Sequence, residues 1–301
     1  MLEPVQSQQT FRRIAVRPLT GALGAEISDV DLARPLDEET RREIFAAFRD
    51  YLVVYFPDQP MSHEAHLTFA RLFGRVIQLP QIFPVPECPD LQMIRRDADA
   101  KGRVVGETWH TDSTFLERPP YCVVMRALEV PPSGGDTAFS NLYLAYDALS
   151  PKMKEILCGL RAVHTAARLF GSQQATNLNR SFKFPEIKAG EGDKEITHPV
   201  VCTHPVSGRK FIYVNNVFVH RFDGMTEEES APLLQYLFDH CAKVDFTCRV
   251  RWHKDQLLIW DNRATYHRAI ADYDGCARHM VRATVEGPRP SAAGQDDVSR
   301  N

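Results

Sequence analysis

Three segments of the chain place apolar residues at the spacing of a helix that buries one face. Each segment opens on a residue that caps helix N-termini: Asp37, Ser62 or Thr226. In the third segment Glu229 supplies the second half of a capping box. The pattern predicts three helices whose apolar stripes face the protein core. They are residues 37–49 with Ile44, Phe45 and Phe48; residues 62–73, ended by Gly74, with Phe69, Leu72 and Phe73; and the segment after Thr226 with Leu233, Leu234, Leu237 and Phe238.

Short runs rich in β-branched and aromatic residues separate these helices. They are bounded by Gly and Pro turns, as is typical of a barrel or a double sheet. We predict a mainly β protein with flanking helices. The expected strands are 51–56, 121–128, 160–164, 211–214, 246–252, 257–260 and 278–286.

Three polar stretches have few apolar anchors and frame one domain. Residues 1–10 and 288–301 are expected to be flexible ends, because they have little to pack. Residues 172–195 carry Asn and Gly and are predicted to form a mobile loop or lid near the active site. Residues 11–287 then form a single domain, since domains built on β barrels reach this length.

Composition removes several classes of function. The 301 residues carry 36 Lys and Arg against 39 Asp and Glu, a net charge of −3, with both signs interspersed. We therefore expect no nucleic-acid partner. No apolar run approaches the roughly 20 residues that cross a bilayer, and the N-terminus lacks the regions of a signal peptide. Seven cysteines without a Cys-x-x-Cys pair predict reduced thiols, and the cytoplasm is the expected compartment.

A His-x-Asp motif at His110 and Asp112, with His267 further along, supplies the chemistry. On an extended segment, residues i and i+2 point to the same side, so His110 and Asp112 can hold one metal ion. Two imidazoles and one carboxylate leave open positions on an octahedral ion and suit Fe(II) that must also bind a cosubstrate and oxygen. The same set describes hydrolytic zinc sites, so the ligands alone leave the metal open.

A His-x-Asp motif also arises by chance, and the chain contains a second one at His253 and Asp255. That copy precedes the expected strand 257–260 and reads as a polar turn. The first copy follows a Gly-containing loop, lies beside Trp109 and leads into a Pro-Pro break. We therefore assign the metal to the first copy.

Four segments resemble the taurine dioxygenase / 2,4-dichlorophenoxyacetate dioxygenase family of Fe(II)- and 2-oxoglutarate-dependent oxygenases. They occur in the family's order and spacing, within a similarity that extends from about residue 14 to residue 287. The resemblance implies a double-stranded β-helix, a jelly roll of the cupin type, and the use of Fe(II), 2-oxoglutarate and O2. The segments are WHTDSTF at 109–115, GGDT at 134–137, WDNR at 260–263 followed by His267, and RHMVRAT at 278–284.

The resemblance assigns roles to single positions. His110, Asp112 and His267 would be the iron ligands. Arg278 would bind the distal carboxylate of 2-oxoglutarate, aided by Thr137, because a guanidinium meets a carboxylate with two parallel hydrogen bonds.

Arg282 would hold the acidic group of the primary substrate, because its even spacing places it on the same strand face as Arg278. Met280 lies between them, whereas Val281 and Ala283 lie on the other face. This pattern indicates the lining of a half-polar pocket. A solvated strand face would be the ordinary alternative.

The substrate follows from departures within the family. Taurine-binding members carry a histidine and an asparagine where this chain has Leu79 and Gly106. Losing these polar groups favours a larger, more apolar substrate, since a zwitterion needs partners. Aromatic residues suit an aryl ring, although each of them is also a candidate core residue. The expected substrate-binding residues are Arg282, Leu79, Gly106, Ser113, Phe115, Phe170 and Phe218.

Within the family, the chain is closest in appearance to the (R)-phenoxypropionate (dichlorprop) dioxygenases, in residues 14–26, 93–96 and 246–252. We therefore expect a small organic acid, an aryloxyalkanoate, to be cleaved to a phenol and a 2-oxo acid. Taurine, alkylsulfonates and alkyl sulfates remain the alternative. A metal-dependent hydrolase or a cupin-like binding protein is more distant, because neither requires a carboxylate clamp such as Arg278. The helical faces leave a homo-oligomer as the expected assembly.

Overall fold

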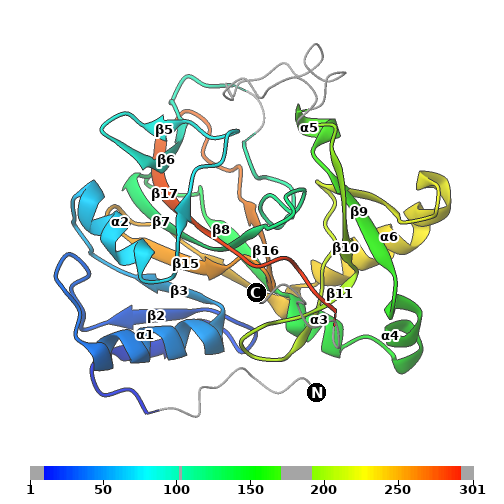
Figure 1. Ribbon diagram of the computed structural model, residues 1–301. Coiled ribbons are helices and arrows are strands. Elements are labelled where there is room, and N and C mark those ends of the chain that lie inside the picture. The colour runs from blue at the N-terminus through cyan, green and yellow to red at the C-terminus, as the bar shows by residue number, and fades with distance from the viewer. Residues whose placement is uncertain (1–9, 102–103, 171–191, 293–301) are drawn as a thin grey trace.

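The computed structural model describes residues 10–101, 104–170 and 192–292. Strands dominate these segments and helices lie on the outside (Figure 1). The helices are α1 Glu38–Tyr51, α2 His63–Arg71, α3 Leu142–Asp147, α4 Pro151–Leu157, α5 Ala167–Phe170 and α6 Glu227–Cys241, with a short 3-10 turn at Val244–Phe246.

The predicted caps form as expected. The side chains of Asp37 and Ser62 accept hydrogen bonds from the third residue beyond each of them. Thr226 and Glu229 form the full capping box of α6. All three predicted helices are therefore confirmed. They could be predicted because capping signals are local in the sequence.

A large sheet forms the first layer of the jelly roll. Its strands follow the order β1-β2-β3-β15-β7-β17-β6-β5, with β4 paired to β17. Only β2 and β3 pair in parallel among these strands. The bounds are β1 Ala15–Pro18, β2 Ala25–Ser28, β3 Val53–Phe56, β4 Val76–Ile77, β5 Pro84–Val85, β6 Cys88–Arg96, β7 Pro120–Glu129, β15 Leu257–Asp261 and β17 Arg278–Glu286.

A smaller sheet faces the large one and completes the jelly roll. Its strands follow the order β14-β8-β16, so β16 is an edge strand of this sheet. Phe139 from β8 and Trp260 from β15 meet between the layers, with ring centroids 5.8 Å apart. The predicted fold class is therefore confirmed. The strands of this layer are β8 Thr137–Asn141, β14 Thr247–Val250 and β16 Thr265–Ala269.

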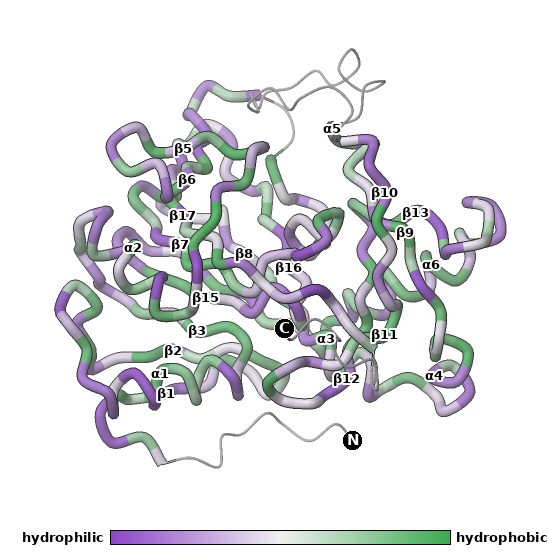
Figure 2. Tube along the Cα trace, in the orientation of Figure 1, coloured by the Kyte–Doolittle hydropathy of each residue, from purple (hydrophilic) through white to green (hydrophobic). Residues whose placement is uncertain are grey.

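The two faces of the large sheet bury different cores. Met280 on β17 packs in the cluster between the two sheets. Val281 and Ala283 pack in a second cluster with residues of α1 and α2 on the outer side. The expected division of the β17 faces is thus confirmed, and Arg278 and Arg282 share the inner face. Figure 2 shows β3 as hydrophobic for most of its length, as a strand between two packed layers requires.

Two smaller sheets and α6 extend the molecule on the side opposite α1 and α2 (Figure 1). One has the order β10-β9-β13, and the other pairs β11 with β12. Their strands are β9 Arg161–Thr165, β10 Glu195–Pro199, β11 Val201–Thr203, β12 Lys210–Ile212 and β13 Val219–Phe222.

Some predicted strand limits were wrong. The strand expected from residue 51 begins at Val53, because Tyr51 completes α1 and Leu52 caps it with a φ of 63°. The strand expected over 246–252 is limited to β14, since Phe246 belongs to the 3-10 turn. The strand expected over 211–214 ends at Ile212.

The predicted flexible segments 1–10, 172–195 and 288–301 fall mostly outside the described residues. At their described margins, Glu195 begins β10. Ser291 accepts a backbone hydrogen bond from Thr203, at 2.9 Å. The mobility of these three segments stays a prediction.

Two further expectations concern membranes and thiols. Within the described ranges, no helix has the length and apolar character needed to span a bilayer. All seven cysteines lie in these ranges and are free. The reduced state of these thiols stays a prediction.

Phe139 supports both the core and the site, and its truncation gives a first prediction. The ring is fully buried and stacks on His267 with centroids 6.0 Å apart. We expect Phe139→Ala to lower the free energy of unfolding by about 3–5 kcal/mol, measured by chemical denaturation. Truncating the exposed Tyr236 should change it by less than about 0.5 kcal/mol; equal losses at the two positions would contradict this account.

Candidate metal centre

His110 and His267 are held together by their backbones. His267 lies in β16, and His110 pairs with the outer edge of that strand in a single antiparallel bridge. The amide of His110 donates to the carbonyl of His267 at 3.0 Å, and the amide of His267 donates to His110 at 2.8 Å. The imidazole centroids are 4.2 Å apart. The two histidines are 157 residues apart in the sequence, and this backbone pairing brings them side by side.

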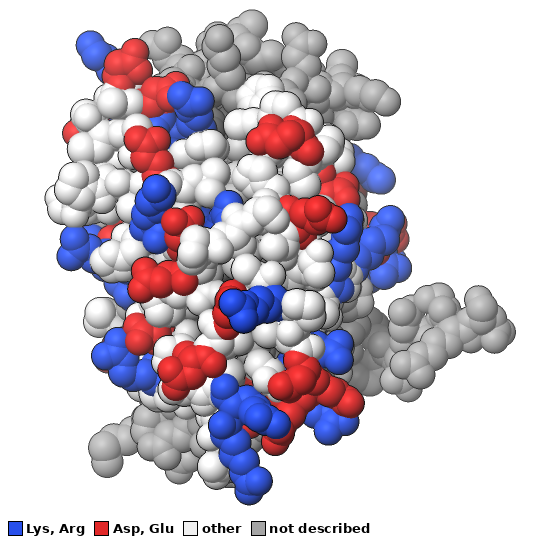
Figure 3. Space-filling model, turned by 90° about the vertical axis from the view of Figure 1, so that its left-hand side faces the viewer, with Lys and Arg blue, Asp and Glu red and all other residues white. Residues whose placement is uncertain are grey.

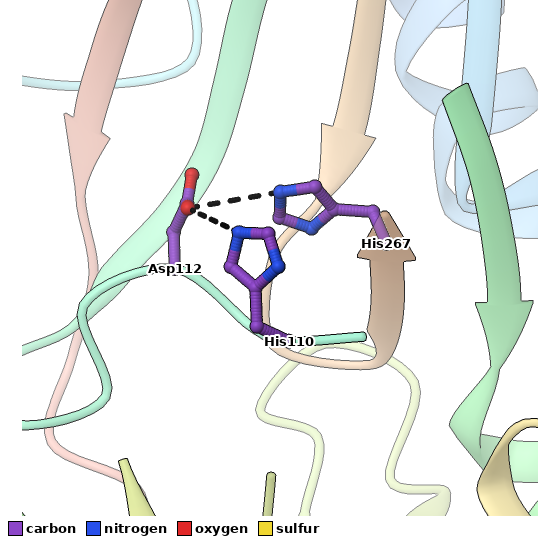
Figure 4. Close-up of side chains that lie close together, drawn as sticks. All are labelled: His110, Asp112 and His267. Atoms are coloured by element: carbon purple, nitrogen blue, oxygen red, sulfur yellow. Dashed lines mark ion pairs between the residues drawn. The ribbon is translucent and has the colours of Figure 1, made fainter. Parts of the chain in front are cut away.

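Asp112 completes a compact group of three donors. Its Oδ1 lies 3.4 Å from Nε2 of His110 and 3.7 Å from Nε2 of His267. Figure 4 shows both rings turned toward this carboxylate. The candidate donor atoms all lie within 4.8 Å of one another. The structure therefore brings the three predicted ligands to one point between the sheets.

The protonation states suit metal binding. Nδ1 of His110 lies 2.7 Å from the carbonyl oxygen of Thr108, which favours the tautomer whose Nε2 lone pair is free. Burial, and then the neighbouring His110, lower the pKa of His267 to about 3, so its imidazole is neutral. Burial would raise the pKa of Asp112, but Arg282 and then His267 outweigh it and hold the pKa well below its usual value. Two imidazoles and one carboxylate fit a divalent iron site with open positions.

Arg282 is bonded to one of the predicted ligands. Its Nη2 donates to Oδ2 of Asp112 at 2.8 Å, and its Nε donates to Thr284 at 3.2 Å. The pair is buried, with side-chain exposures of 4% and 13%. Arg282 therefore holds the carboxylate oxygen opposite the one that faces the histidines. Its predicted contact with a substrate stays a prediction.

Arg278 begins β17 on the same face as Arg282, and Trp252 connects it to Thr137. The side chain is 7% exposed, and its Nε has no hydrogen-bond partner among the described residues. Its guanidinium carbon lies 5.8 Å from the ring centroid of Trp252, whose Nε1 donates to Thr137 at 2.9 Å. A buried guanidinium with an unused Nε, connected through Trp252 to a hydroxyl, is suited to a carboxylate.

The Gly-Gly turn before Thr137 shapes this end of the site. Gly135 has a φ of 69°, and a Cβ placed there would lie 3.4 Å from Cδ of Arg278 and 3.0 Å from Pro131. Glycine both permits this backbone and leaves room for the arginine. The turn is held from outside, since Asp272 accepts a hydrogen bond from the Gly135 amide at 2.8 Å.

Gly106 and Ser113 lie directly beside the ligands. A Cβ on Gly106, whose φ is 79°, would lie 3.2 Å from Cε1 of His110. Ser113 follows Asp112 with a φ of 51° and accepts a hydrogen bond from Gln81 at 3.0 Å. Leu79 is buried, and its backbone is held by the amide of Gln92. The Gln81–Ser113 bond thus links the segment around Leu79 to the metal segment.

The predicted aromatic residues are partly brought together. The rings of Phe115 and Phe218 lie 5.0 Å apart, and Phe218 is buried. Phe170 ends α5, and its side chain lies outside the described residues. The pocket-lining role of all three stays a prediction.

Sequence reasoning missed three residues that support the site. Trp252 joins Thr137 to Arg278, Gln81 binds Ser113, and Asn262 binds the backbone of Asp112. Trp252 and Asn262 lie in the segments that carry the family resemblance, so position gave a signal. Gln81 lies outside those segments, and nothing in the sequence around it indicated a role in the site. The second His-x-Asp lies in a turn as predicted, with Asp255 at a φ of 61°.

Comparison with known proteins identifies the family. The family model described as "Taurine catabolism dioxygenase TauD, TfdA family" matches residues 15–284. An α-ketoglutarate-dependent 2,4-dichlorophenoxyacetate dioxygenase from Cupriavidus pinatubonensis is 32% identical, with 89% of this chain and 96% of the relative covered. An α-ketoglutarate-dependent sulfate ester dioxygenase from Pseudomonas putida is 33% identical, with 91% and 90% covered.

A solved structure agrees with these relatives. The crystal structure of a taurine dioxygenase from Burkholderia xenovorans superposes with a TM-score of 0.79 at 32% identity and covers 94% of each chain. The comparisons confirm the predicted enzyme class and cofactors, and they set aside the hydrolase and the binding protein. The chain therefore belongs to the TauD/TfdA family of dioxygenases, oxidoreductases that use Fe(II), 2-oxoglutarate and O2.

Proposed function

We propose that the protein oxygenates a hydrophobic organic acid, an aryloxyalkanoate such as (R)-phenoxypropionate. The observation that carries this proposal is the apolar character of Leu79 and Gly106, where taurine-binding members have polar side chains. Leu79 is buried, and Gly106 lies so close to His110 that a Cβ there would be 3.2 Å from Cε1 of the ring. An amine would find no partner from either residue, whereas an apolar group needs none.

The residues divide the work of the reaction. Iron bound by His110, Asp112 and His267 supplies oxygen activation coupled to decarboxylation of 2-oxoglutarate. Arg278 and Thr137, joined through Trp252, would hold the distal carboxylate of the cosubstrate and so fix its orientation in the site. One oxygen atom enters succinate, and the other enters the substrate carbon next to the ether oxygen. The hydroxylated product then breaks its C–O bond to give a phenol and a 2-oxo acid, with succinate and CO2 as coproducts.

Arg282 is the candidate for the substrate carboxylate, within a limit set by its contacts. Its Nη2 is engaged by Asp112 and its Nε by Thr284. The substrate would therefore share the guanidinium with Asp112. This arrangement ties substrate binding to the orientation of a ligand.

A second candidate function uses the same chemistry on taurine, alkylsulfonates or alkyl sulfates. Relatives of both kinds are similarly close, at 32% and 33% identity. The distinguishing experiment measures succinate formation and oxygen uptake with Fe(II), 2-oxoglutarate and a panel of substrates. The panel contains (R)- and (S)-phenoxypropionate, phenoxyacetate, taurine and an alkyl sulfate.

The outcomes of the panel separate the candidates. We expect one phenoxypropionate enantiomer to release phenol in step with succinate. Coupling to taurine or the sulfate ester alone would overturn the aryloxyalkanoate proposal and leave the enzyme class intact.

Polar side chains at positions 79 and 106 should shift the substrate preference toward taurine. The double change Leu79→His and Gly106→Asn should move the ratio of kcat/KM for taurine over phenoxypropionate upward by at least about 10-fold, the value of one hydrogen bond to a charged group. Asparagine tolerates the positive φ of residue 106. Steady-state kinetics on both substrates measure the ratio, and Phe83→His on the exposed Phe83 is the control. An unchanged ratio would show that these positions do not select the substrate.

Location and assembly remain expectations. We expect a cytoplasmic enzyme that forms a homo-oligomer and binds neither nucleic acid nor membrane. On the face drawn in Figure 3, acidic and basic side chains are mixed, without a block of one sign. Sedimentation of the purified protein measures the assembly.

A further inference from the structure

Asp112 depends on a side chain for its main-chain hydrogen bonds. The bridge to β16 consists of the single pair His110 and His267. Two residues further on, the amide of Asp112 donates to Oδ1 of Asn262 at 2.9 Å. Nδ2 of Asn262 donates back to the carbonyl oxygen of Asp112 at 3.1 Å. The carboxamide thus takes the place that a neighbouring strand would occupy.

Asn262 is itself held rigidly. It is fully buried, and its backbone amide donates to the carbonyl of Tyr121 at 2.9 Å. Its Nδ2 also donates to Pro120 at 3.2 Å. Both amide hydrogens and the amide oxygen are therefore in use, which leaves one orientation of the carboxamide. An atom group this constrained can serve as a reference point for Asp112.

The backbone next to Asp112 is in an unfavourable conformation and needs the restraint that Asn262 provides. Ser113 has a φ of 51°, a region that costs free energy for a residue other than glycine. The chain therefore leaves the metal segment through an unfavourable turn directly after the ligand. Arg282 restrains only the carboxylate, through Oδ2. The peptide groups on both sides of Asp112 are restrained by Asn262.

Asn262 also connects the two parts of the site. It follows β15 directly and lies five residues before His267 on the connection to β16. Thr111 strengthens the same junction by donating to the carbonyl of Thr265 at 3.0 Å. The connection that delivers one histidine therefore also sets the main chain of the carboxylate ligand.

We propose that Asn262 is a positioning residue that places the Asp112 carboxylate for the metal. The inference rests on the assignment of His110, Asp112 and His267 as ligands. Asn262 acts through Asp112 and touches neither of the histidine rings' donor atoms in the contacts described above. Partners of metal ligands typically contribute 10- to 100-fold to metal affinity, roughly the effect expected here.

The test measures binding of Co(II) alone to the metal-free protein, followed by its visible absorbance. Co(II) absorbance reports both affinity and coordination geometry. We expect Asn262→Ala to weaken Co(II) binding by about 10- to 100-fold and to change the shape of the spectrum. Asn262→Asp keeps the volume and the acceptor but loses the donor toward the carbonyls of Asp112 and Pro120, so it should weaken binding as well.

Asn141 provides a matched control. It is equally buried, caps α3 through the amides of Tyr143 and Leu144, and donates to Ala22 at 2.7 Å. Asn141→Ala should lower the unfolding temperature by a similar amount and leave the Co(II) affinity and spectrum at wild-type values. This separates a loss of positioning from a general loss of stability.

Two results would overturn the inference. One is a wild-type Co(II) affinity and spectrum in folded Asn262→Ala, or in Asn262→Asp if the alanine variant does not fold. The other is an equal loss of affinity in Asn141→Ala. A failure of the proposed function is recognised separately, because wild-type protein would then bind Co(II) and yet consume no 2-oxoglutarate with any substrate of the panel.

Discussion

Replacing Arg278 with methionine should lower kcat/KM for 2-oxoglutarate by about 30- to 5000-fold, the 2–5 kcal/mol typical of removing one partner of a buried charge pair. The reason is the environment of the guanidinium. It is 7% exposed, its Nε has no hydrogen-bond partner in the described segments, and Trp252 lies beside it. Burial lowers its pKa from the usual value, and Tyr273 and then Asp136 offset part of that effect. The site therefore holds a cation whose donors await an anion.

Succinate formation at varied 2-oxoglutarate concentration measures this effect. Arg278→Lys should fall between wild type and Arg278→Met, because an ammonium keeps the charge and loses the two parallel hydrogen bonds. Arg251 is exposed and donates to the carbonyl of Pro132, so Arg251→Met is the control. Unchanged kinetics in Arg278→Met would show that Arg278 does not bind the 2-oxoglutarate carboxylate.

Replacing His267 with alanine should abolish metal-dependent turnover. The change removes one of only two imidazoles in the ligand group and leaves Asp112 and His110 to hold the ion. The loss of metal affinity should exceed the roughly 10- to 100-fold that follows from losing a partner of a ligand. Titration of the metal-free variant with Mn(II), together with oxygen uptake, measures both effects.

The second His-x-Asp motif supplies the control for this change. His253 is exposed and lies in the turn before β15. His253→Ala should retain wild-type metal affinity and turnover. If His253→Ala loses the metal and His267→Ala retains it, the assignment of the site is wrong.

The bond between Arg282 and Asp112 links the two halves of the proposed reaction. Arg282 stands on the large sheet, whereas His267 stands on the small one. A substrate carboxylate that binds Arg282 would act on the guanidinium that holds Asp112. Substrate binding and ligand orientation are therefore expected to be coupled.

Much of the fold was predictable because its signals are local. The caps at Asp37, Ser62 and Thr226 act on residues within one turn, so the helices they begin were found. The strand β17 was predicted with its correct bounds, and its two faces bury the residues expected. The pair His110 and Asp112 was also found, because the two residues lie two positions apart in one short segment.

Strands rich in polar residues were not predicted. β8 and β16, which carry Thr137 and His267, have the sequences TAFSN and TYHRA. Their stability comes from pairing with each other and from burial under the large sheet, which no short window of sequence reveals. The 3-10 turn that includes Phe246 was not predicted either. The apolar pattern there resembles that of a strand.

The sequence by itself determined which donors the protein offers to a metal and, through its resemblance to a family, which cosubstrate the enzyme uses. Only the tertiary structure decided how Asp112 is held: Arg282 takes one carboxylate oxygen, and Asn262 takes the peptide groups on both sides. In the chain, Asn262 lies 150 residues from Asp112 and Arg282 lies 170 residues from it. Their contacts exist because the two sheets pack face to face, and that arrangement has no local signature.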